Sequence, residues 1–183
     1  YALRKLFERM RADERQQFPP ESVFISDFMH EMERNEDAFT EKQFNNRMEL
    51  GNTLLSDYYQ THIHQFNKVV VTEYPIRNAE MEGIPITGVF DKIEFIGKDV
   101  NVVDYKTGAV KYAREKLLPP NEKNPDGGDY WRQIMFYKIL LDSQRTKPWK
   151  MISGEVDFIE KDESGEFVRH KFAIASDQVD IVK

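Results

Sequence analysis

The sequence predicts an α/β (α+β) fold, in which a mixed central sheet is flanked by helices and preceded by a helical N-terminal region. Three observations predict it. Apolar residues recur at helical spacing over the first 66 residues, β-branched and aromatic runs follow from residue 68, and one more helical stretch separates three early strands from two late ones. Elements in this order form layers around one sheet.

A chain of 183 residues with 40% hydrophobic and 13% aromatic residues can bury a substantial core. We expect residues 1–66 to form a helical region that packs on an α/β core of residues 67–183, giving one compact domain overall. Because the sequence starts at Tyr1 rather than at methionine, we expect a piece excised from a longer protein.

Composition and charge exclude several classes of protein. The absence of cysteine excludes disulfides and thiolate metal sites, and it favours a cytoplasmic location. No run of about 18 apolar residues is present, so no membrane span is expected. The net charge of −6 argues against a protein that coats nucleic acid. It is compatible with a local acidic pocket surrounded by basic residues.

The helical N-terminal region is predicted to contain three helices. The first ends before the prolines at 19 and 20, because proline moves the preceding residue out of the helical region. The other two cover residues 22–35 and 41–66. Gly51 lies within the last of these, where glycine costs about 1 kcal/mol relative to alanine. It marks either close packing or a break.

The rest of the chain is predicted to contain the sheet and one helix. The helix covers residues 129–143, with Asp129 as its N-cap. A loop with three prolines and two glycines precedes it, at residues 117–128. The predicted strands cover residues 69–74, 89–96, 99–106, 151–159 and 167–175.

The hairpin of residues 89–106 is the most informative feature of the sequence. Gly97 and Lys98 suit a two-residue type II′ turn, in which the numbers of paired residues sum to 195. Asp91 then lies opposite Asp104, where like charges repel, and Lys106 lies on the same face. A divalent cation is the simplest compensation.

Two alternatives to that interpretation stay open at this stage. A three-residue turn would pair Asp91 with Tyr105 and separate the two acids, and charges at a strand end often form a solvated rim. The other residues on this face are apolar, Ile93 and Val102 among them. They favour a buried site, because buried charge without a partner is costly. Basic residues also gather after the hairpin: Lys106, Lys111, Arg114, Lys116, Arg132 and Lys138.

Three motifs in this order resemble a known family. They are G-x-x-D at residues 88–91, D-Y-K-T-G at residues 104–108 and Q-x-x-x-Y at residues 133–137. Their combination is similar to the PD-(D/E)XK nuclease superfamily, and most similar to its RecB-like branch, the nuclease domain of bacterial helicase–nuclease proteins of recombination and repair. The resemblance covers roughly residues 51–141 and implies a restriction-endonuclease-like core.

The resemblance implies a metal site at the hairpin. Asp91 and Asp104 would hold Mg²⁺ or Mn²⁺ together with the backbone carbonyl of Tyr105, since these hard cations prefer oxygen ligands. Lys106 would position or deprotonate the attacking water, or stabilise charge that develops on the phosphate.

The helix motif adds two catalytic residues to this set. Gln133 and Tyr137 are one helical turn apart and share a face. The resemblance implies that they orient Lys106 or contact DNA, whereas without the hairpin Tyr137 would be interpreted as core and Gln133 as surface. Glu73 is a candidate for an additional carboxylate, and a surface glutamate is the alternative. Tyr105, Tyr130 and Trp131 are candidates for stacking on bases, with core packing as the alternative for Trp131.

One position departs from the RecB-like pattern. A histidine metal ligand usually stands four residues after the helix glycine, and counting from Gly51 that position is Leu55. The nearby His62 and His64 are too far along the helix to replace it, and both are predicted to be surface residues. This departure puts the completeness of the metal shell in question.

Three functions are therefore considered. The first is a Mg²⁺- or Mn²⁺-dependent deoxyribonuclease, an exonuclease rather than an endonuclease, which processes DNA ends together with a helicase. The second is a nuclease-fold module that does not cut and that guides DNA or a partner subunit, as Leu55 suggests. The third is a metal-dependent hydrolase of small phosphoesters. No G-x-x-x-x-G-K-[ST] phosphate loop is present, so an ATPase motor would lie outside this sequence.

Overall fold

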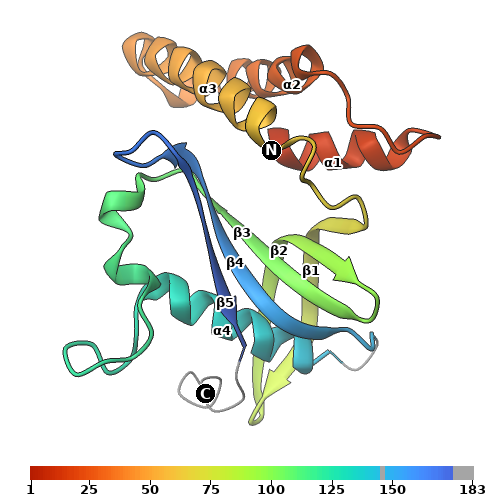
Figure 1. The fold of residues 1–183 in the computed structure, drawn as a ribbon, viewed down its shortest axis with the longest axis vertical. Helices are drawn as coiled ribbons and strands as arrows, with labels where there is room; N and C mark the ends of the chain where they lie inside the picture. Colours follow the sequence, from red (N-terminus) through yellow and green to blue (C-terminus); the bar gives the residue numbers. More distant parts are fainter. Residues whose placement is uncertain (145–146, 175–183) are drawn as a thin grey trace. The chain divides into compact units, whose positions relative to one another are not determined.

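The computed structural model describes residues 1–144 and 147–174 (Figure 1). Helices come first, followed by three strands, a helix and two strands, as predicted. The elements are α1 (Ala2–Ala12), α2 (Glu21–Arg34), η1 (Glu36–Ala38), α3 (Glu41–His62), β1 (Val70–Met81), β2 (Ile84–Ile96), β3 (Asp99–Lys106), η2 (Val110–Tyr112), η3 (Glu115–Leu117), α4 (Asp129–Asp142), β4 (Lys150–Lys161) and β5 (Phe167–Ala173).

The chain divides into two compact units, residues 1–68 and residues 69–183. The first contains helices α1 to α3, and the second contains the sheet and α4. The division into domains expected at residue 66 stays a prediction. Among the described residues, no helix is both long enough and apolar enough to cross a membrane.

Helix α3 shows how the first unit follows from its sequence. It begins at a capping box, in which Thr40 Oγ1 accepts from the Gln43 N–H and the Gln43 side chain accepts from the Thr40 N–H. A Cβ atom at Gly51 would lie 2.2 Å from Phe28 Cζ, so this glycine lets α2 approach α3 closely. Gly51 therefore marks close packing and not a break. The helix ends at His62, four residues earlier than predicted.

The second unit is built on a sheet whose five described strands have the order β1-β2-β3-β4-β5. Neighbouring strands are antiparallel except β3 and β4, which are parallel. A parallel pair needs a long crossover connection, and the segment that contains α4 supplies it (Figure 1). The predicted class, a mixed sheet with helices after a helical N-terminal region, is confirmed and is consistent with a restriction-endonuclease-like core.

Two glycines let α4 lie close against the sheet. A Cβ atom at Gly154 on β4 would lie 2.3 Å from Ile134 Cγ2, and one at Gly88 on β2 would lie 2.5 Å from Leu140 Cδ1. Ile134 and Leu140 are fully buried. The face of α4 that carries Gln133 is thereby fixed relative to the strands.

Asp129 is not the N-cap of α4, because Gly128 occupies that position and Asp129 is the first helical residue, where it forms an ion pair with Arg132. Gly128 fits there because a Cβ atom would lie 2.3 Å from the Lys116 carbonyl oxygen. The predicted last strand reached residue 175, which lies outside the described residues.

Candidate functional site

The β2–β3 hairpin has the predicted turn and register. Gly97 has a φ of +68°, as the first position of a type II′ turn requires. Pairing runs from Ile96 and Asp99 to Lys92 and Val103, and each pair sums to 195. This register excludes the alternative with a three-residue turn.

The ladder stops one pair before Asp91 and Asp104. In a regular continuation the Tyr105 N–H would bond to the backbone of Phe90, because every second pair from the turn exchanges hydrogen bonds. Instead it donates to Asp91 Oδ2 at 2.9 Å. The carboxylate of Asp91 thus takes the place of a backbone acceptor. Within the described chain, no residue donates a hydrogen bond to its other oxygen, Oδ1.

The alternation of side chains also changes at Asp91. In a regular strand, residues three positions apart face opposite sides of the sheet. Phe90 and Ile93 nevertheless lie in the same core, where the Phe90 ring contacts the Tyr137 ring on α4 with centroids 4.9 Å apart. On β1 the position facing Asp91 is Glu73, since the pairs on either side sum to 164. Glu73 has a φ of +49°, which is unusual for a residue with a side chain. Both strands are therefore distorted beside Asp91.

Asp104 is buried and is held by three side chains. It is 2% exposed. Its Oδ1 accepts from the Tyr137 hydroxyl at 2.8 Å and from Gln133 Nε2 at 2.9 Å, and Lys106 Nζ lies 2.7 Å from Oδ2. Charge-assisted contacts of this kind are short and strong. The four residues that the sequence singled out on two elements thus meet in one network.

Lys106 is held in place by the same network. Its ammonium donates to Gln133 Oε1 at 2.8 Å, and it lies 4.7 Å from the centre of the Tyr130 ring. Because an ammonium only donates, it fixes Gln133 with the oxygen toward Lys106 and the nitrogen toward Asp104. The Gln133 nitrogen also donates to the Tyr137 hydroxyl at 2.9 Å.

Burial and neighbouring charges change the pKa of two of these groups. Burial raises the pKa of Asp91, the N–H of Tyr105 lowers it, and the negative charges of Asp104 and Glu73 raise it further. Burial and the charge of Asp104 raise the pKa of Tyr137 well above its usual range, so Tyr137 stays a neutral donor. Two carboxylates that repel each other inside a protein create a place for a cation.

Comparison with known proteins identifies the family. The sequence profile of the PD-(D/E)XK nuclease superfamily matches residues 2–180. The chain belongs to the PD-(D/E)XK nuclease superfamily. No curated protein matches the sequence. A crystal structure of the protein SSO0001 is similar with 16% sequence identity and a TM-score of 0.37, over 83% of this chain and 65% of that one.

Membership of the PD-(D/E)XK superfamily suggests a nuclease that hydrolyses phosphodiester bonds with a divalent metal ion, typically Mg²⁺. The donor atoms fit such an ion, since two carboxylates and a backbone carbonyl offer only oxygen. Burial, and after it the charge of Asp104, raises the pKa of Asp91, and a bound cation would favour the ionised form. Among the described residues, no group of three histidine, cysteine or acidic side chains could hold a metal ion.

Other residues considered from the sequence belong to other elements. Leu55 and His62 lie on α3 in the first unit, and His64 follows them. His62 is not a surface residue as predicted, because it is 6% exposed and packs on the Tyr58 ring at 4.6 Å; His64 is exposed. Trp131 is buried in the core.

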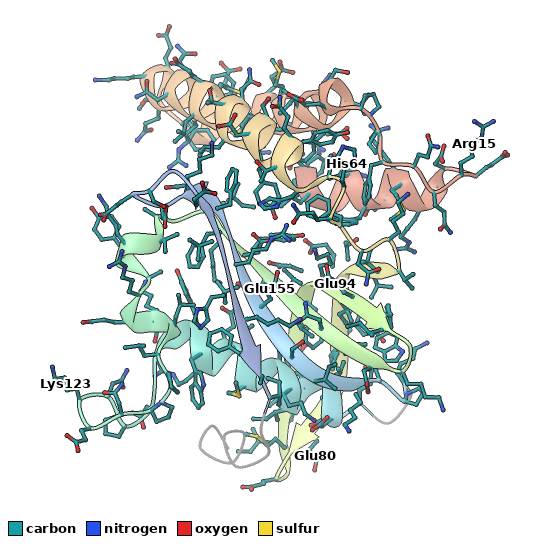
Figure 2. The ribbon with its side chains drawn as sticks, viewed as in Figure 1. Arg15, His64, Glu80, Glu94, Lys123 and Glu155 are labelled. Atoms are coloured by element: carbon teal, nitrogen blue, oxygen red, sulfur yellow. The ribbon has the colours of Figure 1, made fainter. Side chains whose placement is uncertain are left out.

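Sequence reasoning missed a second polar network, on the other face of the sheet. Lys92 forms an ion pair with Glu94 at 2.9 Å, Asn101 donates to Glu94 at 3.1 Å, and Ser153 donates to Asn101 at 2.7 Å. Figure 2 labels Glu94 together with Glu155, which the register places on this same face. The alternation of Lys92 and Glu94 with apolar residues was the available signal.

Proposed function

We propose that this chain is a Mg²⁺- or Mn²⁺-dependent deoxyribonuclease domain. One observation carries the proposal: the buried network in which Asp104 holds Lys106, Gln133 and Tyr137 next to Asp91. A structural ion pair needs only two of these residues. Five functional groups gathered at one strand end, two of them with a raised pKa, support a catalytic site.

Asp91, Asp104 and the backbone carbonyl of Tyr105 would hold the cation. When bound, the cation polarises a phosphoryl oxygen and lowers the pKa of a bound water. Asp91 suits this role because its Oδ2 is already occupied by the Tyr105 N–H, which leaves Oδ1 for the ion. Asp104 is oriented by Tyr137 and Gln133 at Oδ1, and its Oδ2 lies against Lys106.

Lys106 would act on the phosphate of the substrate. The ammonium donates one hydrogen bond, to Gln133 Oε1, and is ion-paired with Asp104 Oδ2. Because an ammonium has three N–H donors, it can also donate to a phosphate oxygen, where negative charge develops as the bond to the leaving group breaks. Gln133 and Tyr137 would be positioning residues, since they act through Asp104 and Lys106.

Digestion of labelled DNA tests the proposal. Single- and double-stranded DNA would be incubated with the protein in Mg²⁺, in Mn²⁺ and in EDTA. We expect cleavage in either metal and none in EDTA, and we expect Asp104→Ala and Lys106→Ala to abolish it. Asp99→Ala is the matched control, because it removes a carboxylate at the far end of the same strand.

The same assay separates the alternatives. If the folded protein cuts no DNA in either metal, the module that guides DNA or a partner subunit becomes the better explanation, and Leu55 supports it. If it cleaves bis(4-nitrophenyl) phosphate but no DNA, the small phosphoester hydrolase is favoured. The resemblance of the motifs to the RecB-like branch supports an exonuclease that processes DNA ends with a cytoplasmic helicase. Release of nucleotides from end-labelled linear DNA, and none from a circle, tests that part.

A further inference from the structure

The segment between β3 and α4, which contains η2 and η3 (Figure 1), carries several basic residues and one tyrosine. Its apolar residues Val110, Ala113 and Leu117 are buried in the core of the second unit. The residues between them therefore face outward: Lys111, Tyr112, Arg114, Glu115 and Lys116 are all exposed. We call these five residues the outer face of the segment. It carries three basic residues and one acidic residue on a chain whose net charge is −6.

Tyr112 is the unusual member of this outer face. It is 74% exposed, although a tyrosine ring normally buries much of its area. Lys111 Nζ lies 4.9 Å from the centre of its ring. An exposed aromatic ring beside a cation is the arrangement that stacks on an unpaired base while the cation meets the phosphate.

The outer face is continuous with the catalytic network. The Tyr130 ring lies 4.7 Å from Lys106 Nζ on one hand and 5.3 Å from Lys116 Nζ on the other. The Gly128 N–H donates to the Leu118 carbonyl at 2.8 Å, which ties η3 to the start of α4. Lys116 is therefore held next to the helix that carries Gln133.

Other basic residues near the site are already engaged. Arg132 is paired with Asp129 and with the Gly127 carbonyl, and Lys138 is paired with Asp142. The structure gives Lys111 and Lys116 no carboxylate partner among the described residues. Arg114 lies close enough to Asp162 to lower the pKa of that carboxyl group. Lys111 and Lys116 are thus the cations best placed to meet phosphates.

We propose that this outer face binds an unpaired DNA strand, with Tyr112 stacked on a base and with Lys111 and Lys116 on phosphates, and that it leads the strand to Lys106. This inference rests on the proposed nuclease function for its direction, and it names the substrate as single-stranded DNA. It predicts binding that does not depend on cleavage.

Fluorescence anisotropy of labelled dT20 in EDTA tests the proposal, because nothing is cut there. Stacking on one base is worth roughly five- to 150-fold in affinity, so we expect Tyr112→Ala to weaken binding by about tenfold and Tyr112→Phe to keep it within about twofold. Tyr1→Ala is the matched control, since Tyr1 is 45% exposed with Arg4 and Lys5 over its ring. It should bind like wild type.

Salt dependence gives a second readout, which a merely structural role would not change. The logarithm of the binding constant falls linearly with the logarithm of the salt concentration. Each lost phosphate contact makes this fall less steep by about 0.7 for a single strand. Lys111→Ala and Lys116→Ala should each show this decrease. A 20-base-pair duplex, which offers no unpaired base, should bind Tyr112→Ala and wild type equally.

Several results would overturn the proposal. They are wild-type affinity of Tyr112→Ala for dT20, an equal loss for Tyr1→Ala, an equal loss on the duplex, or no binding of dT20 by wild type. If wild type cleaves DNA and any of these results is found, strand binding by the outer face is rejected and the proposed nuclease function is kept. Binding as expected without any cleavage would reject the nuclease and keep the outer face as a strand-binding surface.

Discussion

The N–H of Tyr105 donates to the carboxylate of Asp91 at the point where β2 and β3 stop pairing. One side chain therefore both ends a β-ladder and serves the candidate metal site. Because the backbone fixes Asp91 Oδ2, the position of the second oxygen follows from the fold. A ligand oxygen that the fold already holds in place need not be reoriented when an ion binds.

Substitutions of Asp91 can separate its two roles. Asp91→Asn keeps an acceptor for the Tyr105 N–H and loses the charge, whereas Asp91→Ala loses both. A donor left without an acceptor costs about 1–3 kcal/mol when buried. We expect the free energy of unfolding in EDTA, measured by urea denaturation, to be lower for Asp91→Ala than for Asp91→Asn by roughly that amount. Equal stabilities would show that Asp91 does not act as a ladder acceptor.

Metal binding should stabilise the folded chain. An ion that binds only the native state at 100 times its Kd adds about 2.7 kcal/mol to the free energy of unfolding. We expect Mn²⁺ to raise the Tm of wild type and of the control Asp99→Asn, and to leave the Tm of Asp91→Asn and Asp104→Asn nearly unchanged. A similar rise in all four proteins would place the metal elsewhere.

The hydroxyl of Tyr137 should matter for activity more than for folding. Tyr137→Phe leaves Oδ1 of Asp104 with one donor, Gln133, in place of two. Loss of a partner that orients a metal ligand typically costs 10- to 100-fold in metal affinity or activity, and we expect that range in the DNA cleavage rate.

A matched tyrosine provides the control for that variant. Tyr74→Phe also removes a hydroxyl that takes part in a hydrogen bond, because Gln144 Nε2 donates to it at 2.7 Å, outside the network around Asp104. It should cut DNA at nearly the wild-type rate. If both variants lose activity alike, the effect of Tyr137→Phe reflects general damage to the fold.

The close approach of α4 to the sheet should depend on Gly154. In Gly154→Ala the new Cβ would meet Ile134 Cγ2 at 2.3 Å, next in sequence to Gln133. Overpacking of a core costs about 1–3 kcal/mol, and a shift of α4 would also displace Gln133 from Asp104. We expect lower stability by urea denaturation and slower cleavage. Gly108→Ala, where a Cβ meets nothing within 4 Å, should keep wild-type stability.

The helical unit should lose stability in acid through Glu21. Hydrogen bonds from Ser56 and Gln60 on α3 lower the pKa of Glu21 below its ordinary value of 4.5. The ionised carboxylate therefore stabilises the folded unit above the unfolded pKa, and this contribution is lost as pH falls through the folded pKa. Glu21→Gln should flatten the fall of Tm below pH 4.5, followed by circular dichroism. Glu33→Gln, exposed on the same helix, should retain it.

The sequence predicted much of the geometry of the candidate site, because the signals for it are local. A glycine at the turn fixed the hairpin register. Because side chains alternate between the two faces of a strand, Asp104 and Lys106 were predicted to share one face. Gln133 and Tyr137 share a helix face for the same reason. The distortion at Glu73 and Asp91 could not be predicted, because it arises where β1, β2 and β3 must all satisfy their hydrogen bonds together.

Sequence alone determined the order of the elements, the turn, the pairing register and the residues that carry the nuclease motifs, since each depends on neighbours within a few positions. Only the tertiary structure decided how those residues meet. The carboxylate of Asp91 accepts a hydrogen bond from the Tyr105 N–H and does not simply oppose Asp104. The Gln133 side chain joins Lys106 to Asp104. Such contacts connect residues up to 33 positions apart, and packing of α4 on the sheet through Gly88 and Gly154 creates them.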